Sequence, residues 1–191
     1  DCNSALFFTG LDNALLADED SLQGGVVYLR NSTGATRSIG GEFSVRITYD
    51  DIRLSLGYTY LYATEKNNLN SSEIELNPRH SLGVVTIWEN QEHQLKMGLE
   101  NYWIGRQRVE RNPFRTVAPS YWITGLIAEK GFGRIRLFIN VENMFDTRQT
   151  RYEPLFVGDL ASGSIRTLPV YTPLEGRVIN AGIRYVLRSQ P

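Results

Sequence analysis

The feature that most constrains this chain is an alternation of apolar and polar residues with a period of two. In residues 42–49 and again in residues 52–62, every second side chain is apolar or aromatic. Successive side chains of a β-strand point to opposite faces, so the pattern predicts strands with one apolar and one polar face. The alternation returns over residues 94–103 and 179–187, and no stretch has helical spacing. We therefore expect an all-β, antiparallel fold.

The alternating stretches predict nine strands, several of them long. The usual strand has roughly five or six residues, whereas about ten residues let a tilted strand cross a bilayer. The expected strands cover about residues 4–17, 22–31, 36–50, 52–66, 79–90, 92–107, 119–131, 134–145 and 175–188.

The connections between these strands alternate between short and long from the third strand onward. Minimal turns are expected at Asp50-Asp51, at residues 90–92 and at residues 131–133. The links between them are longer, at residues 67–78, 108–118 and 146–174. A transmembrane β-barrel has short periplasmic turns at one end and longer external loops at the other, so this sorting predicts such a barrel.

The two faces of the strands fit a barrel, although a soluble sandwich would show the same alternation. In a wide barrel the apolar face meets lipid and the polar face lines a wet lumen. In the last strand, Ile183 should then face lipid and Gly182 the lumen, and a change at Gly182 should be tolerated better. The polar face carries Glu42, Arg46, Arg53, Lys96, Glu100, Arg136 and Arg184, whereas Ile179, Ala181, Ile183 and Tyr185 lie on the apolar face.

Composition excludes several classes of protein. The 191 residues carry a formal net charge of -1, which gives no large basic field for nucleic acid. Cys2 is the one cysteine, so a disulfide framework is excluded. There is no start methionine or visible signal peptide, and we expect the chain to begin inside a larger protein.

Residues that could carry chemistry are sparse. His80 and His93 are the only histidines, and without a cysteine or a paired histidine nearby they make a poor metal site. His80 and Ser81 are adjacent and would point to opposite faces of one strand, so they cannot form a catalytic pair. We expect no catalytic residue, no metal site, no cofactor and no enzymatic activity.

Several segments, taken in order, resemble the C-terminal part of the barrel of TonB-dependent outer-membrane receptors. They are LFFTGLDNAL, NSTGATRSIGGEFSVRITYD, LSLGYTYLYATE, LNPRHSLG, NVENMFDTR and PLEGRVINAGIRYVL. NVENMFDTR is similar to the Asn-Leu-Phe-Asp signature of the family. Its Asn143 and Asp146 should bond the backbone where the strand ladder stops. The closing strand of the family usually ends on an aromatic residue, whereas this position is Leu187 here.

This resemblance implies that residues 1–191 form about the last nine strands of a 22-stranded barrel, with the plug domain absent from the chain. It implies a bacterial outer-membrane receptor for active uptake of a scarce nutrient, and a ferric siderophore is the expected one. Expected partners are a small nutrient chelate, outer-membrane lipid, lipopolysaccharide and the TonB complex, which would act through the missing plug region.

One expected external loop, RQRVERNPFR, is rich in arginine. Arginine offers forked donors for carboxylate, phosphate or catecholate oxygens, and Phe114 and the nearby aromatics can stack. We expect Arg108, Arg111 and Arg115 to bind an anionic ferric chelate. A basic loop that faces water or lipopolysaccharide phosphates is the competing interpretation.

A second class of protein stays open at this point. The chain could be a self-contained small outer-membrane barrel or a soluble all-β carbohydrate-binding domain. A small closed barrel needs an even strand number and a packed interior, whereas nine strands and long charged side chains favour part of a wide barrel.

Overall fold

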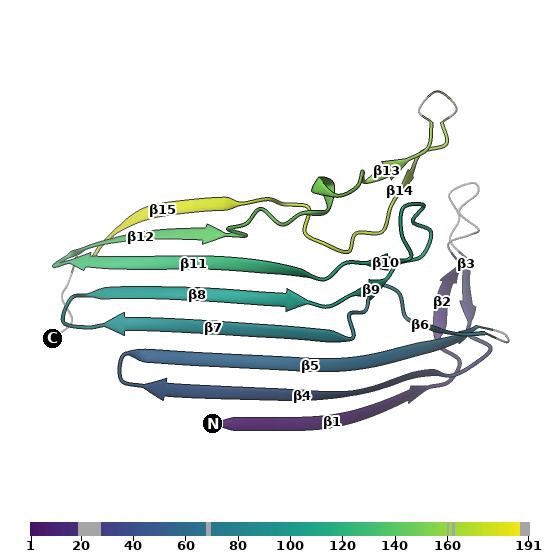
Figure 1. Cartoon of the computed structure of the whole chain (residues 1–191), viewed down its shortest axis with the longest axis horizontal. Coiled ribbons are helices and arrows are strands. Elements are labelled where there is room, and N and C mark those ends of the chain that lie inside the picture. The colour runs from purple at the N-terminus through teal and green to yellow at the C-terminus, as the bar shows by residue number, and fades with distance from the viewer. Residues whose placement is uncertain (19–27, 68–69, 160, 162, 188–191) are drawn as a thin grey trace.

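The structure is a computed structural model, and it describes residues 1–18, 28–67, 70–159, 161 and 163–187. One antiparallel sheet dominates it, as expected from the alternating sequence (Figure 1). Its long strands lie in chain order: β1 (Cys2–Leu11), β4 (Thr36–Tyr49), β5 (Ile52–Asn67), β7 (His80–Asn90), β8 (Leu95–Ile104), β11 (Tyr121–Phe132), β12 (Ile135–Glu142) and β15 (Val178–Tyr185).

Short elements decorate one end of this sheet. β6 (Asn70–Glu73) pairs with the end of β5. Three small hairpins are β2 (Leu15–Asp18) with β3 (Tyr28–Asn31), β9 (Gln107–Arg108) with β10 (Val117–Ala118), and β13 (Phe156–Val157) with β14 (Arg166–Thr167). A 3₁₀ turn covers Gln149–Arg151. In the described part of the chain, no helix is long and apolar enough to cross a membrane.

The first two expected strands differ from the observed ones. The expected strand 4–17 breaks near Asn13, whose φ of 57° lies in the left-handed region and ends the extended run. Its second part, β2, pairs with β3 outside the main sheet. Of the expected strand 22–31, residues 28–31 form β3, and residues 22–27 lie outside the described residues. Eight long strands, rather than nine, therefore follow one another in the main sheet.

With this correction, the first connection of the main sheet also fits the alternation of long and short links. The β2–β3 hairpin belongs to a long link between β1 and β4, at the same end as the hairpins β9–β10 and β13–β14 (Figure 1). The turns after β4, β7 and β11 all lie at the opposite end (Figure 1). Long loops and short turns thus alternate along the whole chain, as a transmembrane barrel requires.

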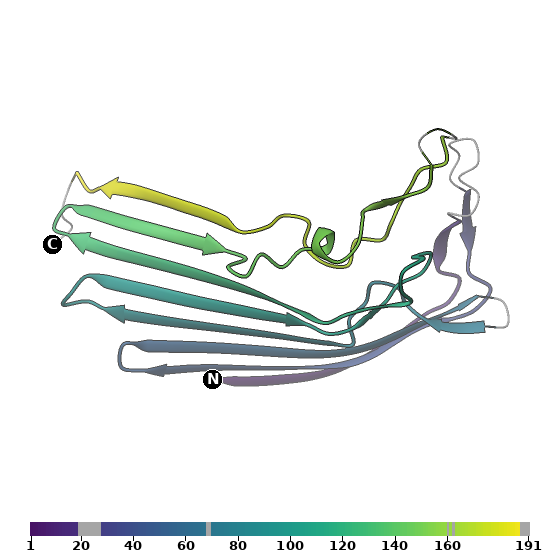
Figure 2. The ribbon, with the colours of Figure 1, turned by 45° about the horizontal axis from the view of Figure 1, so that its top comes forward.

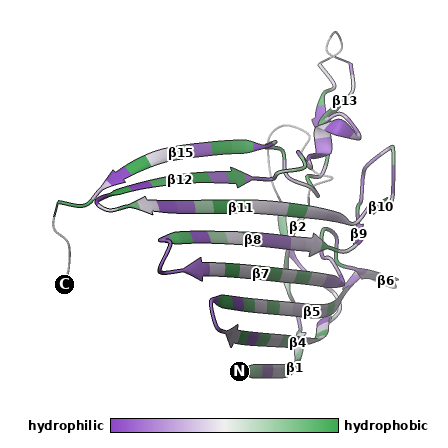
Figure 3. Ribbon diagram, turned by 60° about the vertical axis from the view of Figure 1, so that its left-hand side comes forward, coloured by the Kyte–Doolittle hydropathy of each residue, from purple (hydrophilic) through white to green (hydrophobic). Residues whose placement is uncertain are grey.

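Strand register keeps the two faces separate. Phe43 pairs with Tyr58, and Ile47 pairs with Leu54. In the last pair of strands, Ile183 faces Leu137 across the ladder, while the polar Asn180 faces Asn140. Hydrophobic and hydrophilic bands alternate along β11, β12 and β15 (Figure 3).

The apolar face of the sheet has no second layer against it among the described residues. Ile183 is 74% exposed, and Leu6 is 92% exposed. The sheet curves and leaves its two edge strands, β1 and β15, apart (Figure 2). A sandwich would bury this face against another sheet, so the described part fits an unclosed segment of a barrel wall.

The NVENMFDTR segment ends β12 as expected. Asn143 and Asp146 both have positive φ, 46° and 57°. The Asn143 amide donates to the carbonyl oxygens of Thr147 at 2.8 Å and Glu175 at 3.1 Å, and its Oδ1 accepts from the Thr147 N–H at 2.9 Å. Asp146 Oδ1 accepts from the Arg177 N–H at 3.3 Å. The two side chains replace the missing ladder bonds and fix both ends of the last long loop.

Candidate functional site

The candidate site is the end of the sheet that carries the long loops, where the arginine-rich loop meets the last loop. β8 ends at Ile104, and the backbone then passes close to β7: Gly105 N–H donates to His80 O at 2.8 Å. A Cβ on Gly105 would lie 2.7 Å from the same carbonyl oxygen, so only glycine allows this approach. The chain then forms the hairpin β9–β10.

This hairpin divides the arginine-rich loop into two sides. Gln107 and Ala118 pair with each other and are buried, whereas Arg108 pairs with Val117 on the other side. Gln107 Nε2 donates to Tyr171 O at 3.2 Å, which places the last loop on the buried side. Val109, Ala118 and Tyr171 form the buried apolar cluster of the described residues.

The carboxylate of Glu153 joins the two loops. Its side chain is 1% exposed and forms an ion pair with Arg115, with 2.7 Å between Nε and Oε2. Its other oxygen, Oε1, accepts hydrogen bonds from Asn112 Nδ2 at 2.8 Å and Gln149 Nε2 at 3.3 Å. A buried carboxylate is stable only when it is paired and hydrogen-bonded, and this one is both.

Gln149 fixes the fold of the last loop around this carboxylate. It is fully buried, its Nε2 donates to Pro169 O at 2.9 Å, and its Oε1 accepts from the Tyr171 N–H at 2.9 Å. The Arg115 guanidinium lies 5.5 Å from the centre of the Tyr171 ring. Burial, together with the negative charge of Glu153, raises the pKa of Tyr171 to about 12.

The three arginines expected to bind a ligand do not form one patch. Arg115 lies on the buried side, in the ion pair with Glu153. Arg108 lies on the other side, where Nη1 donates to Glu73 O at 2.7 Å and the guanidinium pairs with Glu110. Arg111 is exposed, with a φ of 52° that marks the turn of the loop. Among their neighbours, Phe114 is 54% exposed.

Sequence reasoning missed Glu153 and Gln149. Both lie in the loop after β12, where no periodicity distinguishes them from other polar residues. The partners of Glu153 in the arginine-rich loop, Arg115 and Asn112, are 38 and 41 positions away. Gln149 bonds to Pro169 and Tyr171, which are 20 and 22 positions away. A single sequence gives no signal for contacts at such separations.

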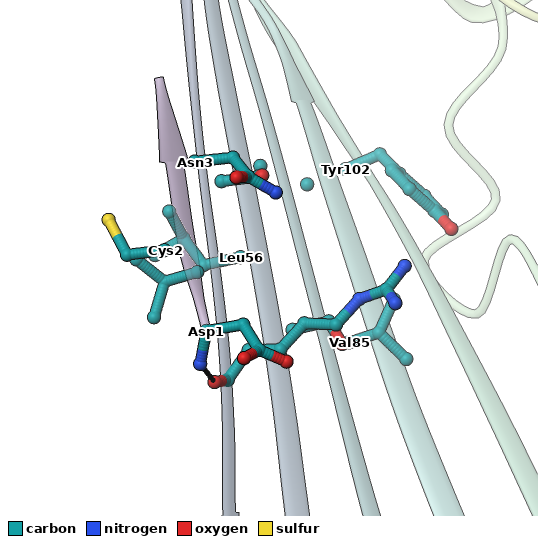
Figure 4. A pocket seen from close by; sticks show the side chains of 12 residues that line it. Asp1, Cys2, Asn3, Leu56, Val85 and Tyr102 are labelled. Carbon is teal, nitrogen blue, oxygen red and sulfur yellow. Dashed lines mark hydrogen bonds between the residues drawn. The ribbon is translucent and has the colours of Figure 1, made fainter.

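The polar face of the sheet carries a hollow of about 610 Å³. Figure 4 shows Asn3 and Tyr102 on this side, while Cys2 and Leu56 point to the other side of the sheet. Ser44, Gly57 and Gly83 lie between Asn3 and Tyr102 in the strand register, and their small side chains leave the space open.

Charged side chains line the same polar face near the short turns. Lys96 pairs in register with both Glu89 and Glu129. Arg136 forms an ion pair with Glu129 at 2.8 Å, and Arg53 forms one with Glu89. Opposite charges placed directly across a sheet each stabilise it by roughly 0.2–1 kcal/mol, so this face is built for water rather than for a dry core.

Neither histidine lies in a metal-binding cluster. Among the described residues, no group of three or more His, Cys, Asp or Glu could hold a metal ion. His80 lies on the apolar face, where Nδ1 is 2.6 Å from the Tyr58 hydroxyl and the ring is 5.1 Å from that of Tyr60. His93 lies in the turn after β7, where its N–H donates to Asn90 Oδ1 at 2.8 Å.

Several solved structures share this architecture. The ferric-catecholate import receptor Fiu of E. coli K12 superposes with a TM-score of 0.64 and 18% identity, over 97% of this chain and 25% of that one. The outer-membrane ferripyoverdine receptor of Pseudomonas aeruginosa gives a TM-score of 0.62 and 16% identity, over 96% and 25%. The copper transporter OprC gives a TM-score of 0.64 and 13% identity, over 96% and 28%.

The chain spans about a quarter of the length of these receptors. The comparison with curated proteins gives no match. The family described as TonB dependent receptor-like, beta-barrel, matches residues 3–144, which is most of the chain. The chain therefore belongs to the β-barrel family of bacterial outer-membrane TonB-dependent receptors.

Proposed function

We propose that residues 1–191 are the C-terminal part of the barrel of a larger receptor that takes up a scarce nutrient across the outer membrane. The observation that carries this proposal is the family match over residues 3–144. The curved, unclosed sheet, one face of which carries ion pairs, supports it. A plug domain and a TonB-contact segment would come from the rest of that protein. The function of this larger receptor would then be binding and transport, and not catalysis.

We propose a ferric siderophore as the nutrient. Fiu is named as a ferric-catecholate import receptor, and another similar structure holds ferripyoverdine. OprC, which is equally similar in fold, is named as a copper transporter. Copper is therefore the second candidate.

The ligand surface that we propose contains Arg108, Arg111 and Arg115. Arg111 and the exposed ring of Phe114 lie at the tip of the loop. Arg115 remains 26% exposed beside Glu153, so it keeps donors for an anionic ligand. Arg108 lies on the opposite side of the hairpin from Arg115, so its contribution should be measured separately.

Uptake by a strain that lacks the receptor gene, with and without the intact receptor restored, tests this function. We expect restored, TonB-dependent accumulation of labelled iron from at least one ferric siderophore under iron limitation. Restored accumulation of copper but not of iron would make copper, and not a ferric siderophore, the transported nutrient. No accumulation of either, with a correctly inserted barrel, would contradict both substrates.

The ligand surface has its own test. Changing Arg111 and Arg115 to Ser should weaken binding of the transported chelate. The effect should be largest at low salt, because exposed charges are screened over about 10 Å at 0.1 M ionic strength. The triple variant that also changes Arg108 measures the added contribution of that residue. Unchanged affinity in the triple variant would show that the arginine-rich loop is not part of the ligand surface.

A further inference from the structure

The contact between the arginine-rich loop and the last loop has a base and a tip. The base lies beside the sheet, where Gln107 donates to Tyr171 O and where Val109, Ala118 and Tyr171 pack together. The tip lies farther along the loop, in residues 112–115. Within the described residues 112–115, both hydrogen bonds that cross to the last loop end on Glu153. We call these two bonds the tip contact.

The tip contact depends on the positive charge of Arg115. Glu153 is 1% exposed, and of its three donors only Arg115 is charged, because Asn112 and Gln149 donate through neutral amides. A buried carboxylate is strongly destabilised when its charged partner is lost. Any group that draws Arg115 away from Glu153 therefore also weakens the bond from Asn112.

Arg115 can be reached by a second anion. Its side chain is 26% exposed, and it donates to Glu153 through Nε. Arg79, in contrast, binds Glu73 through both Nε and Nη2. The guanidinium fork suits two parallel bonds to one anion, so the pairing of Arg115 with Glu153 leaves the outer part of the fork for a ligand.

Two anions on this guanidinium would repel each other. A ligand oxygen bonded to Arg115 lies close to the carboxylate of Glu153, in a site that is mostly shielded from water, where like charges interact strongly. Glu153 relieves this repulsion by turning toward water, which breaks the tip contact. Gln149 keeps its bonds to Pro169 O and the Tyr171 N–H, so the last loop retains its own fold. The base is not affected, because its contacts do not involve Glu153.

We propose that Glu153 competes with the anionic nutrient for Arg115, so that binding of the nutrient releases the tip contact. Glu153 is thus a positioning residue that occupies Arg115 until the nutrient replaces it. Because such coupling is reciprocal, the closed tip contact also lowers the affinity of the receptor for the nutrient. The proposal rests on the proposed function, in which Arg115 belongs to the ligand surface.

Ligand affinity gives the first test. The intact receptor in detergent is titrated with the gallium complex of a tris-catecholate siderophore, which has the same charge as the iron complex. Glu153→Gln keeps the size of the side chain and removes the competing charge, so it should bind this probe at least about fivefold more tightly. A residue that merely held the ligand site in shape would have the opposite effect. Glu175→Gln removes the same charge from an exposed position of the last loop and should leave the affinity unchanged.

The distance between the loops gives the second test. Spin labels on Pro113→Cys and Phe156→Cys, both exposed, report the tip, and gallium has no unpaired electrons to disturb them. This distance should lengthen when the probe binds to the wild-type background, and it should be long without the probe in Glu153→Gln. Labels on Val117→Cys and Val170→Cys report the base, and their distance should stay the same.

Two results would overturn this proposal and leave the ligand surface standing. The first is binding of the probe to the wild type with no change in the distance at the tip. The second is binding to Glu153→Gln that is no tighter than to the wild type, or an equal gain in Glu175→Gln, which would show a general charge effect. Absence of binding to both the wild type and Glu153→Gln would instead contradict the proposed ligand, and this proposal with it. Migration of the folded barrel on a gel checks that each variant folds.

Discussion

At the scale of single residues, one buried carboxylate holds two external loops together. Glu153 accepts from Arg115, Asn112 and Gln149, so its removal takes the shared acceptor from all three, although Gln149 keeps its bond to Pro169 O. Breaking a buried ion pair by removing one partner costs about 3–5 kcal/mol. We therefore expect Glu153→Ala in the intact receptor to separate the loops, seen as faster hydrogen exchange over residues 146–174.

The matched control for this change is Glu110→Ala. Glu110 also pairs with an arginine of the same loop, but its side chain is 39% exposed. An exposed pair contributes about 0–1 kcal/mol, so exchange in the last loop should stay as in the wild type. Similar exchange in both variants would mean that Glu153 does not join the loops.

Tyr171 offers a second test at this scale. Its hydroxyl is buried and has no hydrogen-bond partner among the described residues, so Tyr171→Phe removes a buried polar atom without breaking a bond. We expect loop stability in Tyr171→Phe to match or slightly exceed the wild type, within about 1 kcal/mol. A large loss of exchange protection in this variant would mean that the hydroxyl has a partner in the intact receptor.

The raised pKa of Tyr171 gives this position a pH dependence. An unfolded tyrosine ionises near pH 10, whereas the pKa of Tyr171 is raised to about 12. The contribution of the neutral Tyr171 side chain to the stability of the contact between the two loops is therefore complete below about pH 10. It is lost as the pH rises toward about 12 and the hydroxyl ionises. Distances between spin labels on Phe114→Cys and Phe156→Cys should lengthen over this range in the wild type, and not in Tyr171→Phe.

The sequence predicted some of these residues and not others. Asn143 could be predicted because a side chain that closes its own turn acts over a few residues. A backbone bond of Asp146 was also predicted, but its partner, the Arg177 N–H at the far end of the loop, was not. Glu153 could not be predicted, because its role arises only when two distant loops meet. Gln149 could not be predicted, because its bonds to Pro169 and Tyr171 form only when the last loop folds back on itself. The arginine-rich loop was visible as a charge cluster, but the sequence does not show that its hairpin sends Arg108 and Arg115 to opposite sides.

At the scale of elements, alternation predicted every long strand of the main sheet to within a few residues at most ends. It failed at Asn13, because a single residue with positive φ breaks a strand without changing the apolar pattern around it. The β9–β10 and β13–β14 hairpins were also missed. Strands of two residues are too short to show a period.

A charge on the apolar face tests the orientation of these strands. Ile183→Arg should destabilise the intact barrel, because the side chain faces lipid, by at most about 2–4 kcal/mol, which is the cost of an arginine at the membrane midplane. The control is Asn180→Arg on the polar face, next to Asn140 and close to Glu142. It should cost much less, measured as urea unfolding of the receptor in lipid. Equal costs would contradict the assignment of faces.

Gly182, although it lies on the polar face, is a poor control. The expectation from the sequence was that this position would tolerate substitution. A Cβ there would lie 2.5 Å from Cζ of Phe138, whose ring covers the glycine from the neighbouring strand. Any larger residue must displace that ring. The loss of stability caused by a substitution at Gly182 would therefore measure the change in packing and not the contact with lipid.

At the scale of the whole molecule, the described chain has edges and faces that need partners. β1 and β15 each pair on one side only, and the apolar face is exposed along the sheet. Soluble monomers rarely expose such large apolar patches, and free strand edges promote association. We expect the isolated 191-residue chain to aggregate in water without detergent. Recovery as a monomer with cooperative thermal unfolding would contradict a wide-barrel origin.

The direction in which the chain crosses the membrane is the property of the whole molecule on which the proposed ligand surface depends. The long loops must face outward and the short turns inward if this surface is to meet its ligand. Cysteine labelling on whole cells can decide this, with the native Cys2 first changed to Ser. Asn112 is unsuitable as an outer position, because it is 9% exposed and bonded to Glu153. Phe114, which is 54% exposed on the same loop, is the better choice.

In the intact receptor, Phe114→Cys should react with a membrane-impermeant thiol reagent on whole cells. Gln91→Cys, in the turn between β7 and β8, should react only after the outer membrane is opened. Labelling at Gln91 and not at Phe114 would reverse the topology and place the proposed ligand surface on the inner side of the membrane.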